Sequence, residues 1–300
     1  MSKSISYDGY FKELLDGFPD DDVVALINGL FGTTYPYDSK ILRLATESHF
    51  DGEEKRSDTM LRIGKDDYLV EVQSENDESM PLRIFVYQYR AALQHRTTLR
   101  ADYLRLDFPK TVVFYLRSNK NTPHELTIEL KLPDSNIVSY KVPTKRLSEY
   151  KPEDLISKSM LIFAPFYSML FENKIAKNPA DVEKLRDIAV FLSDGIKERL
   201  HKEEISKNTA DFATEALRCI LKNVLDKAKV NHKEVDEVME AVEKRYYLET
   251  TRQRAEGKAE GKAEGILEIA LRMLGRGKSV EEIVEDTGLT HREIQRLQLH

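Results

Sequence analysis

The chain has 300 residues, of which 41% are hydrophobic and 33% are charged, and its formal net charge is −6. The apolar content suffices for a sizeable core, whereas the acidic balance excludes a basic surface over the whole molecule, so any contact with nucleic acid must come from a local patch. The single cysteine, Cys219, excludes an intramolecular disulfide framework and favours a reducing, cytoplasmic location.

No membrane association is predicted for this chain. Its first residues lack the basic, apolar and small-residue order of a signal peptide, and no run of about 18 apolar residues follows. The nearest candidate, residues 160–171, is shorter and contains Pro165, so we expect a buried helix there.

The N-terminal residues have a helical period. Four apolar residues recur at i, i+3, i+4 and i+7 and predict one buried helical face: Phe11, Leu14, Leu15 and Phe18. A second helix is expected to begin at Asp20, because acidic residues are favourable in the first turn, and to end at Gly32.

A strand-like period then replaces the helical one. Residues 41–46 alternate, and the runs 59–63 and 68–73 lie on either side of a turn at Gly64, which indicates a hairpin. Helical spacing returns at residues 82–99. Three β-rich runs follow, at residues 111–116, 125–130 and 138–142. We therefore expect an α/β N-terminal domain over residues 1–148, with a mixed sheet flanked by helices.

The second half of the chain is predicted to be helical. An all-α region of three to five helices is expected over residues 149–249. Its breaks are predicted near residues 178–179, 193–195 and 230–231.

A helical C-terminal tail is expected over residues 250–300. It contains a Glu-Gly-Lys repeat with a period of four at residues 255–265, which is either a flexible linker or a self-association helix whose glycine stripe lets a partner approach closely. Two short helices, residues 280–286 and 291–297, resemble a helix-turn-helix.

Three polar residues form the candidate chemical site. On a strand, Glu71 and Gln73 point to the same face, and the hairpin would bring Asp58 near Glu71. Two neighbouring carboxylates repel each other unless a cation lies between them, and Mg²⁺ prefers few carboxylates together with water and phosphate oxygens. Two other interpretations stay open: an edge hairpin with a polar face, and a solvent-exposed Glu71.

Several motifs in this order resemble the recombination-promoting nuclease and putative transposase family of the PD-(D/E)XK nuclease superfamily. They are the opening helix Tyr7-Asp-Gly-Tyr-Phe-Lys-Glu-Leu14, Arg56-Ser-Asp58 before a short strand, the E-x-Q strand Tyr68-Leu-Val-Glu-Val-Gln73, and the Arg/Tyr helix at residues 83–89. The tail repeat and the run at residues 287–290 are also similar. The resemblance covers residues 5–145 and 252–297, and it implies a restriction-endonuclease-like fold.

The resemblance also implies roles for individual residues. Asp58 and Glu71 would bind Mg²⁺ or Mn²⁺, and Gln73 would stand where the superfamily usually has lysine. Since glutamine is neutral, it could orient a water but could not act as a base, so we expect low activity. The first helix would contribute Asp8, or Glu13 if it faces the other way. Tyr87 or Gln88 would be the accessory residue of the following helix.

DNA is the expected partner. The side chains predicted to meet it, unless they belong to solvated helix faces, are Arg56, Arg83, Arg90, Arg292, Gln295 and Arg296. The predicted function is that of a divalent-metal-dependent DNA endonuclease. The alternative is a catalytically weak or inactive DNA-binding or transposition-accessory protein that forms homo-oligomers through residues 255–297.

Overall fold

The computed structural model describes residues 7–44, 49–50, 53–54, 59–75, 77–95, 97–242, 271–274, 278–287, 289 and 294. The chain divides into two compact units, Met1–Glu243 and Lys244–His300, and each is described by itself.

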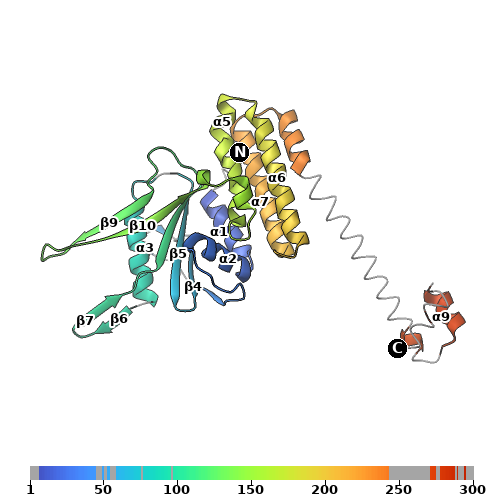
Figure 1. Cartoon of the computed structure of the whole chain (residues 1–300), viewed down its shortest axis with the longest axis horizontal. Helices are drawn as coiled ribbons and strands as arrows, with labels where there is room; N and C mark the ends of the chain where they lie inside the picture. Colours follow the sequence, from blue (N-terminus) through green and yellow to red (C-terminus); the bar gives the residue numbers. More distant parts are fainter. Residues whose placement is uncertain are drawn as a thin grey trace. The chain divides into compact units, whose positions relative to one another are not determined.

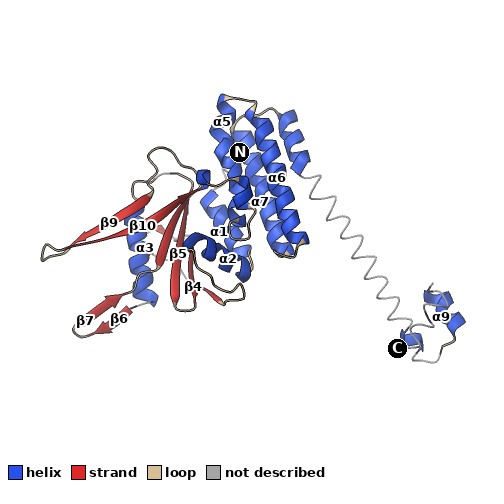
Figure 2. Cartoon of the chain, viewed as in Figure 1, coloured by secondary structure: helices blue, strands red, loops and turns tan. Residues whose placement is uncertain are grey.

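A mixed six-stranded sheet forms the centre of the first unit (Figures 1 and 2). In spatial order its strands are β1 (Ile41–Arg43), β4 (Thr59–Ile63), β5 (Asp66–Gln73), β8 (Lys110–Tyr115), β10 (Ile137–Arg146) and β9 (Glu125–Lys131). β4 is antiparallel to both β1 and β5, β8 is parallel to β5, β10 is parallel to β8, and β9 is antiparallel to β10. This arrangement confirms the predicted mixed sheet with flanking helices.

The β4–β5 hairpin has a two-residue turn at Gly64 and Lys65. Gly64 has a φ of 59°, a left-handed conformation that a residue with a Cβ rarely adopts. The turn fixes the register so that Thr59 pairs with Val70.

The described helices of the first unit follow the chain. They are α1 (Tyr7–Gly17), α2 (Asp20–Phe31), α3 (Met80–His95), the 3₁₀ turn η1 (Leu147–Glu149), α4 (Pro152–Leu155), the 3₁₀ helix η2 (Leu161–Phe171), α5 (Glu172–Lys177), α6 (Asp181–His201), α7 (Lys207–Lys227) and a helical segment at 232–242. Residues 160–171 are buried and helical as predicted, although as a 3₁₀ helix that accommodates Pro165. Gly32 ends α2 with a φ of 66°.

One face of the sheet packs on α1, α2 and the helices that follow residue 150. Val70 and Val72 of β5 lie in this core together with the four apolar residues predicted on α1. Phe114 of β8 stacks on Phe163 of η2 at 3.8 Å between ring centroids, and Phe163 stacks on Phe11 of α1 at 5.4 Å. The predicted domain boundary near residue 148 therefore lies inside a single unit with a continuous core.

The opposite face of the sheet is covered by α3. Met80 and Ile84 pack against Val113 and Tyr115 of β8, in a second and smaller core. The prediction that this helix extends to residue 99 was wrong. It ends at His95, and β6 (Thr97–Arg100) and β7 (Tyr103–Leu106) form a two-stranded ribbon. β-Branched Thr97 and Thr98 favour a strand over a helix at this position.

The predicted break at residues 193–195 was also wrong, because α6 is continuous through it. Gly195 is there for packing: a Cβ at this position would come within 2.6 Å of Cγ2 of Ile156. The helix ends at His201, and α7 begins after Ser206, whose hydroxyl accepts a hydrogen bond from the backbone N–H of Thr209 at 3.1 Å.

The second unit is described only in part. Helix α9 (Val280–Thr287) has a capping box, in which the backbone N–H of Ser279 donates to Glu282 and the N–H of Glu282 donates to the Ser279 hydroxyl. Ile283 and Ile294 are buried against each other. The repeat at residues 255–265 and most of the second predicted short helix lie outside the described residues. No described helix is both long enough and apolar enough to cross a bilayer.

Candidate functional site

Glu71 and Gln73 lie near the C-terminal end of β5, an internal strand hydrogen-bonded to β4 and β8. Their side chains share one face of the sheet, as the alternation predicts, and Gln73 Nε2 donates to Glu71 Oε1 at 2.9 Å. Glu71 is 0% exposed and Gln73 is 7% exposed. An edge hairpin with a polar face and a solvent-exposed Glu71 are both excluded.

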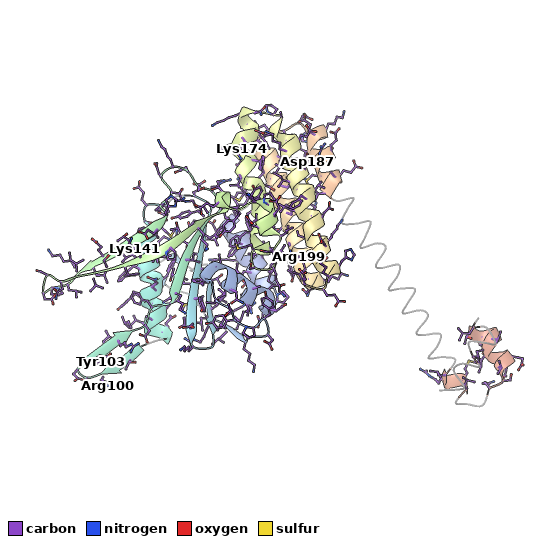
Figure 3. The ribbon with its side chains drawn as sticks, viewed as in Figure 1. Arg100, Tyr103, Lys141, Lys174, Asp187 and Arg199 are labelled. Atoms are coloured by element: carbon purple, nitrogen blue, oxygen red, sulfur yellow. The ribbon has the colours of Figure 1, made fainter. Side chains whose placement is uncertain are left out.

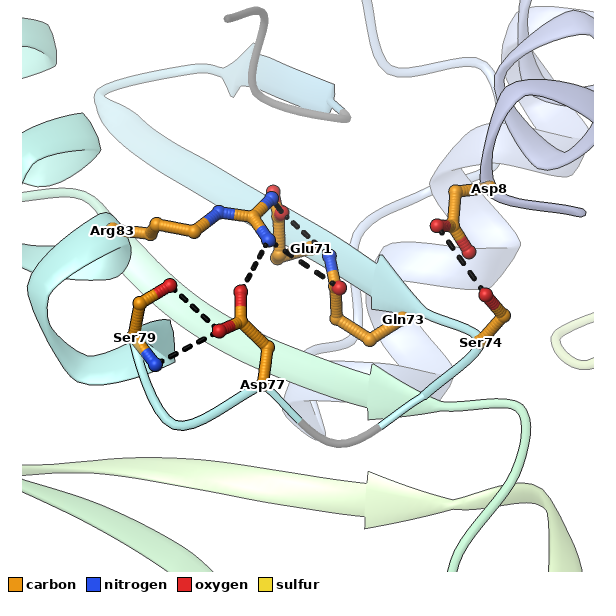
Figure 4. A network of polar contacts seen from close by, with 7 residues as sticks. All are labelled: Asp8, Glu71, Gln73, Ser74, Asp77, Ser79 and Arg83. Carbon is orange, nitrogen blue, oxygen red and sulfur yellow. Dashed lines mark hydrogen bonds and ion pairs between the residues drawn. The ribbon is translucent and has the colours of Figure 1, made fainter. Parts of the chain in front are cut away.

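The charge of Glu71 is neutralised by Arg83 from α3 (Figure 4). Arg83 Nη2 donates to Glu71 Oε1 at 2.7 Å, and Arg83 Nη1 lies 3.4 Å from Gln73 Oε1. Arg83 was predicted to contact DNA. In the structure its guanidinium forms ion pairs with Glu71 and Asp77, and its side chain is 27% exposed.

A second carboxylate, Asp77, holds the other side of the Arg83 guanidinium. Asp77 Oδ2 accepts from Arg83 Nη1 at 3.0 Å. Asp77 Oδ1 accepts from the hydroxyl and the backbone N–H of Ser79, at 2.7 and 2.8 Å. Asp77 thus forms a side-chain turn with Ser79 just before α3 and holds Arg83 in the first turn of this helix.

The electrostatics follow from these contacts. The hydrogen bonds from Ser79 and the contact with Arg83 lower the pKa of Asp77. Burial alone would lower the pKa of Arg83, but the nearby Glu71, Tyr87 and Asp77 outweigh it and raise this pKa above its usual value. Asp77 and Arg83 are therefore charged at neutral pH.

Asp8 of α1 lies at the end of the same strand. Its Oδ2 is 3.5 Å from the hydroxyl of Ser74, the residue after Gln73, and Arg83 is close enough to influence its charge. Burial raises the pKa of Asp8, although Ser74 and Arg83 partly oppose this effect. Glu13, the other predicted acid of α1, is exposed. Of the two, Asp8 is the one that lies beside Ser74, the residue after Gln73.

The position of Asp8 depends on its neighbour Tyr7. Tyr7 is 4% exposed, and its hydroxyl accepts from Asn223 Nδ2 of α7 at 2.6 Å. Arg117 and Lys227 lie over its ring, at 5.2 and 4.8 Å from the centroid. These contacts fix the start of α1 against helix α7 and the end of β8.

The two predicted accessory residues have different environments. Tyr87 lies one turn after Arg83, whose Cζ is 5.8 Å from the tyrosine ring centroid, so Tyr87 borders the site. Gln88 is 3% exposed and lies away from the Glu71 network. Its Nε2 donates to Thr111 at 2.8 Å, and its Oε1 accepts from Tyr140 at 2.6 Å. Gln88 links α3 to β8 and β10.

Other predicted site residues are not brought to the network. Arg90 of α3 is half-buried. A basic and an aromatic side chain outside the predicted set, Arg100 and Tyr103, are exposed at the tip of the β6–β7 ribbon (Figure 3). Five predicted residues lie outside the described ranges: Arg56, Asp58, Arg292, Gln295 and Arg296.

Of the carboxylates Asp8 and Glu71, only Asp8 has an oxygen that fits a hard divalent cation without displacing another group. Asp8 Oδ1 is buried and accepts no hydrogen bond from the described residues. Glu71, in contrast, already has a cationic partner. Among the described residues no cluster of three or more His, Cys, Asp or Glu side chains could hold a metal, and the third predicted carboxylate, Asp58, lies outside them.

Sequence reasoning missed how the network is held together. Asp77, Ser79 and Ser74 were not singled out, and Arg83 was assigned to DNA. An Asp-x-Ser run before an apolar helix is a cap signal that could have located Asp77. Nothing in the sequence shows that Arg83 pairs with Glu71, because that contact depends on where α3 crosses the sheet.

A cavity of about 510 Å³ adjoins the network on the Asp77 side. Tyr115, Asn119 and Asn121 line part of it. The charged side chains of its wall, Asp77, Glu78 and Glu125, are all acidic. This wall offers amide and carboxylate groups, so it is poorly suited to an anionic phosphate.

Comparison with known proteins gives no match: no family model, no curated protein and no solved structure is significantly similar to the chain. The resemblance to the recombination-promoting nuclease family therefore stays a prediction that depends on the motifs themselves.

Proposed function

We propose that this chain is a divalent-metal-dependent DNA endonuclease of the recombination-promoting nuclease type. The observation that carries the proposal is the buried Glu71–Gln73 pair near the end of β5, with Asp8 of α1 beside Ser74, the residue that follows this pair. Burying a carboxylate such as Glu71 is costly, and buried ionisable groups are frequent at functional sites, which favours a functional reason for keeping it.

Asp8 and Glu71, with Asp58, are the residues proposed to hold Mg²⁺ or Mn²⁺. Thr59, which follows Asp58 in the sequence, pairs with Val70, which precedes Glu71. A bound divalent cation supplies Lewis-acid polarisation of the scissile phosphate and a water of lowered pKa.

Gln73 and Arg83 have supporting roles in this proposal. Gln73 is neutral and cannot take a proton, so it orients groups through hydrogen bonds, as it already does with Glu71. The guanidinium of Arg83 can stabilise negative charge on a phosphate. Without the lysine charge at position 73, we expect cleavage to be slow.

The test is nicking of supercoiled plasmid with Mg²⁺ or Mn²⁺ by the full chain. We expect nicking to require the metal. We expect it to fall by about 100-fold or more in Asp58→Asn and in Glu71→Gln, the scale of losing one group that stabilises charge in the transition state. Glu129→Gln, which changes an exposed carboxylate on edge strand β9, should cut like the wild type. Cutting that persists in both site variants would show that the site is wrongly assigned.

The Glu71–Arg83 pair favours a second candidate, a catalytically weak or inactive DNA-binding or transposition-accessory protein. An arginine already neutralises the central carboxylate, so this part of the site is electrostatically complete without a metal. Retarded migration of the plasmid without nicking, unchanged by EDTA, would support this candidate over the nuclease.

A further inference from the structure

Both hydrogen-bonding positions of Glu71 Oε1 are in use. This oxygen accepts from Arg83 Nη2 at 2.7 Å and from Gln73 Nε2 at 2.9 Å. A carboxylate oxygen has two lone pairs, so a further ligand on Oε1 must displace one of these donors.

A divalent cation and the Arg83 guanidinium compete for the single negative charge of Glu71. Mg²⁺ lies about 2.0–2.1 Å from its oxygen ligands, and a guanidinium donating to the same carboxylate would place like charges close together. Because Glu71 is fully buried, water screens this repulsion poorly. Gln73 is neutral and can remain.

A second carboxylate, Asp77, can hold the Arg83 guanidinium when it leaves Glu71. The other terminal nitrogen of Arg83, Nη1, is bound at 3.0 Å by Asp77, and two hydrogen bonds from Ser79 hold Asp77 in place. The Arg83 side chain is 27% exposed, whereas the side chain of Glu71 is 0% exposed. The arginine can therefore rotate outward while it stays tethered to Asp77.

We propose that Arg83 is an exchangeable internal cation: in the metal-free protein it takes the place of the divalent metal on Glu71, and metal binding transfers it to Asp77 alone. The inference rests on the proposed function, because it concerns the same site. Its consequence is that metal affinity is set by competition with Arg83 as well as by the carboxylates.

The test is a titration of the full chain with Mn²⁺, with free Mn²⁺ followed by electron paramagnetic resonance. Arg83→Met removes the competing charge and keeps the apolar stem. We expect it to bind Mn²⁺ at least about tenfold more tightly than the wild type, and Glu71→Gln to abolish this binding. In EDTA, Arg83→Met should melt at a lower temperature than the wild type, since Glu71 then lacks a partner, and Mn²⁺ should raise its melting temperature more.

Arg62→Met is the matched control. Arg62 donates two hydrogen bonds to Asp67, a buried carboxylate on the same strand, at 2.6 and 2.9 Å. Asp67 is four residues before Glu71, about 13 Å along the strand. Mn²⁺ affinity should be the same in Arg62→Met as in the wild type. An equal gain in both arginine variants would indicate a general charge effect and overturn the proposal.

The remaining outcomes separate this inference from the proposed function. If the wild type and Arg83→Met bind Mn²⁺ with equal affinity and Glu71→Gln removes the binding, the competition is refuted but the metal site stands. If neither protein binds Mn²⁺, both proposals fail. Should Arg83→Met not fold, Arg83→Lys replaces it. A lysine cannot span Glu71 and Asp77 together, so its Mn²⁺ affinity should exceed that of the wild type, and an unchanged affinity would refute the competition.

Discussion

At the level of single residues, the half-buried carboxylate of Asp8 and the buried carboxylate of Glu71 have different hydrogen-bond partners. Glu71 is paired with a guanidinium and a side-chain amide. Asp8 has the Ser74 hydroxyl at 3.5 Å and one buried oxygen that accepts no hydrogen bond from the described residues. Burial therefore raises the pKa of Asp8 and makes its ionised form a cost to folding at neutral pH.

This difference predicts the effect of Asp8→Asn on stability. The folded-state pKa of Asp8 is raised, so its contribution to stability is fully present below the unfolded-state pKa and is lost as pH rises through the folded-state pKa. In EDTA at pH 7, the asparagine variant should be more stable than the wild type, and this advantage should disappear below about pH 4. Urea unfolding of both proteins at several pH values measures this difference in the free energy of unfolding.

Glu13→Gln provides the comparison on the same helix. Glu13 is exposed, so its substitution should leave the pH profile of stability unchanged. A wild type that is more stable than Asp8→Asn at pH 7 in EDTA would show that burial does not dominate the environment of Asp8.

At the level of elements, the close approach of α4 to α6 accounts for the glycine inside α6. A Cβ on Gly195 would meet Cγ2 and Cδ1 of Ile156, at 2.6 and 3.2 Å. Glycine is about 1 kcal/mol less favourable than alanine within a helix, so its presence here reflects packing rather than helix preference.

Gly195→Ala is therefore expected to destabilise the protein, by about 1–3 kcal/mol, the range found for overpacked cores. Combining it with Ile156→Ala, which removes the clashing atoms, should cost less than the sum of the two single changes. Urea unfolding of the four proteins tests this, and additive effects would show that the contact is not the reason for the glycine.

At the scale of the whole molecule, the sheet and the helices after residue 150 share one core in the first unit. Phe163 stacks on both Phe114 of β8 and Phe11 of α1. Composition and period alone suggested separate regions, because the sequence changes from mixed to helical patterns near residue 148. The patterns report local structure and do not show which faces meet.

The shared core predicts how fragments behave. Residues 1–148 should not fold cooperatively, because they lack Phe163 and the other residues that cover one face of the sheet, and they should bind a hydrophobic dye. Residues 1–243 should unfold in a single transition near the melting temperature of the full chain. Circular dichroism and dye fluorescence distinguish the two fragments, and a well-folded 1–148 fragment would contradict the shared core.

Light scattering on the same samples addresses the tail. A full chain that forms homo-oligomers, beside a monomeric 1–243 fragment, would support self-association through the second unit. If the full chain and the fragment both have the mass of a monomer, self-association through the second unit is excluded.

Sequence patterns predicted the fold better than they predicted the site. Alternation placed Glu71 and Gln73 on one face, and the helical period placed Phe11 and Leu14 in the core, because both depend on local geometry. The ion pair of Glu71 with Arg83 and the contacts of Gln88 depend on how α3 crosses the sheet. Such long-range contacts leave no periodic signal in a single sequence.

The anchoring of Gln88 has a consequence for kinetics. Its amide ties the middle of α3 to β8 and β10, so the helix backbone is fixed a little more than one turn beyond Arg83. Release of Glu71 then requires only rotation of one partly exposed side chain, a motion of picoseconds to nanoseconds for exposed residues, rather than opening of the backbone on the scale of microseconds or longer. In the proposed exchange of Arg83 for Mg²⁺ or Mn²⁺ on Glu71, the rate should accordingly be limited by breaking the ion pair and by cation dehydration, with no slow conformational step before it.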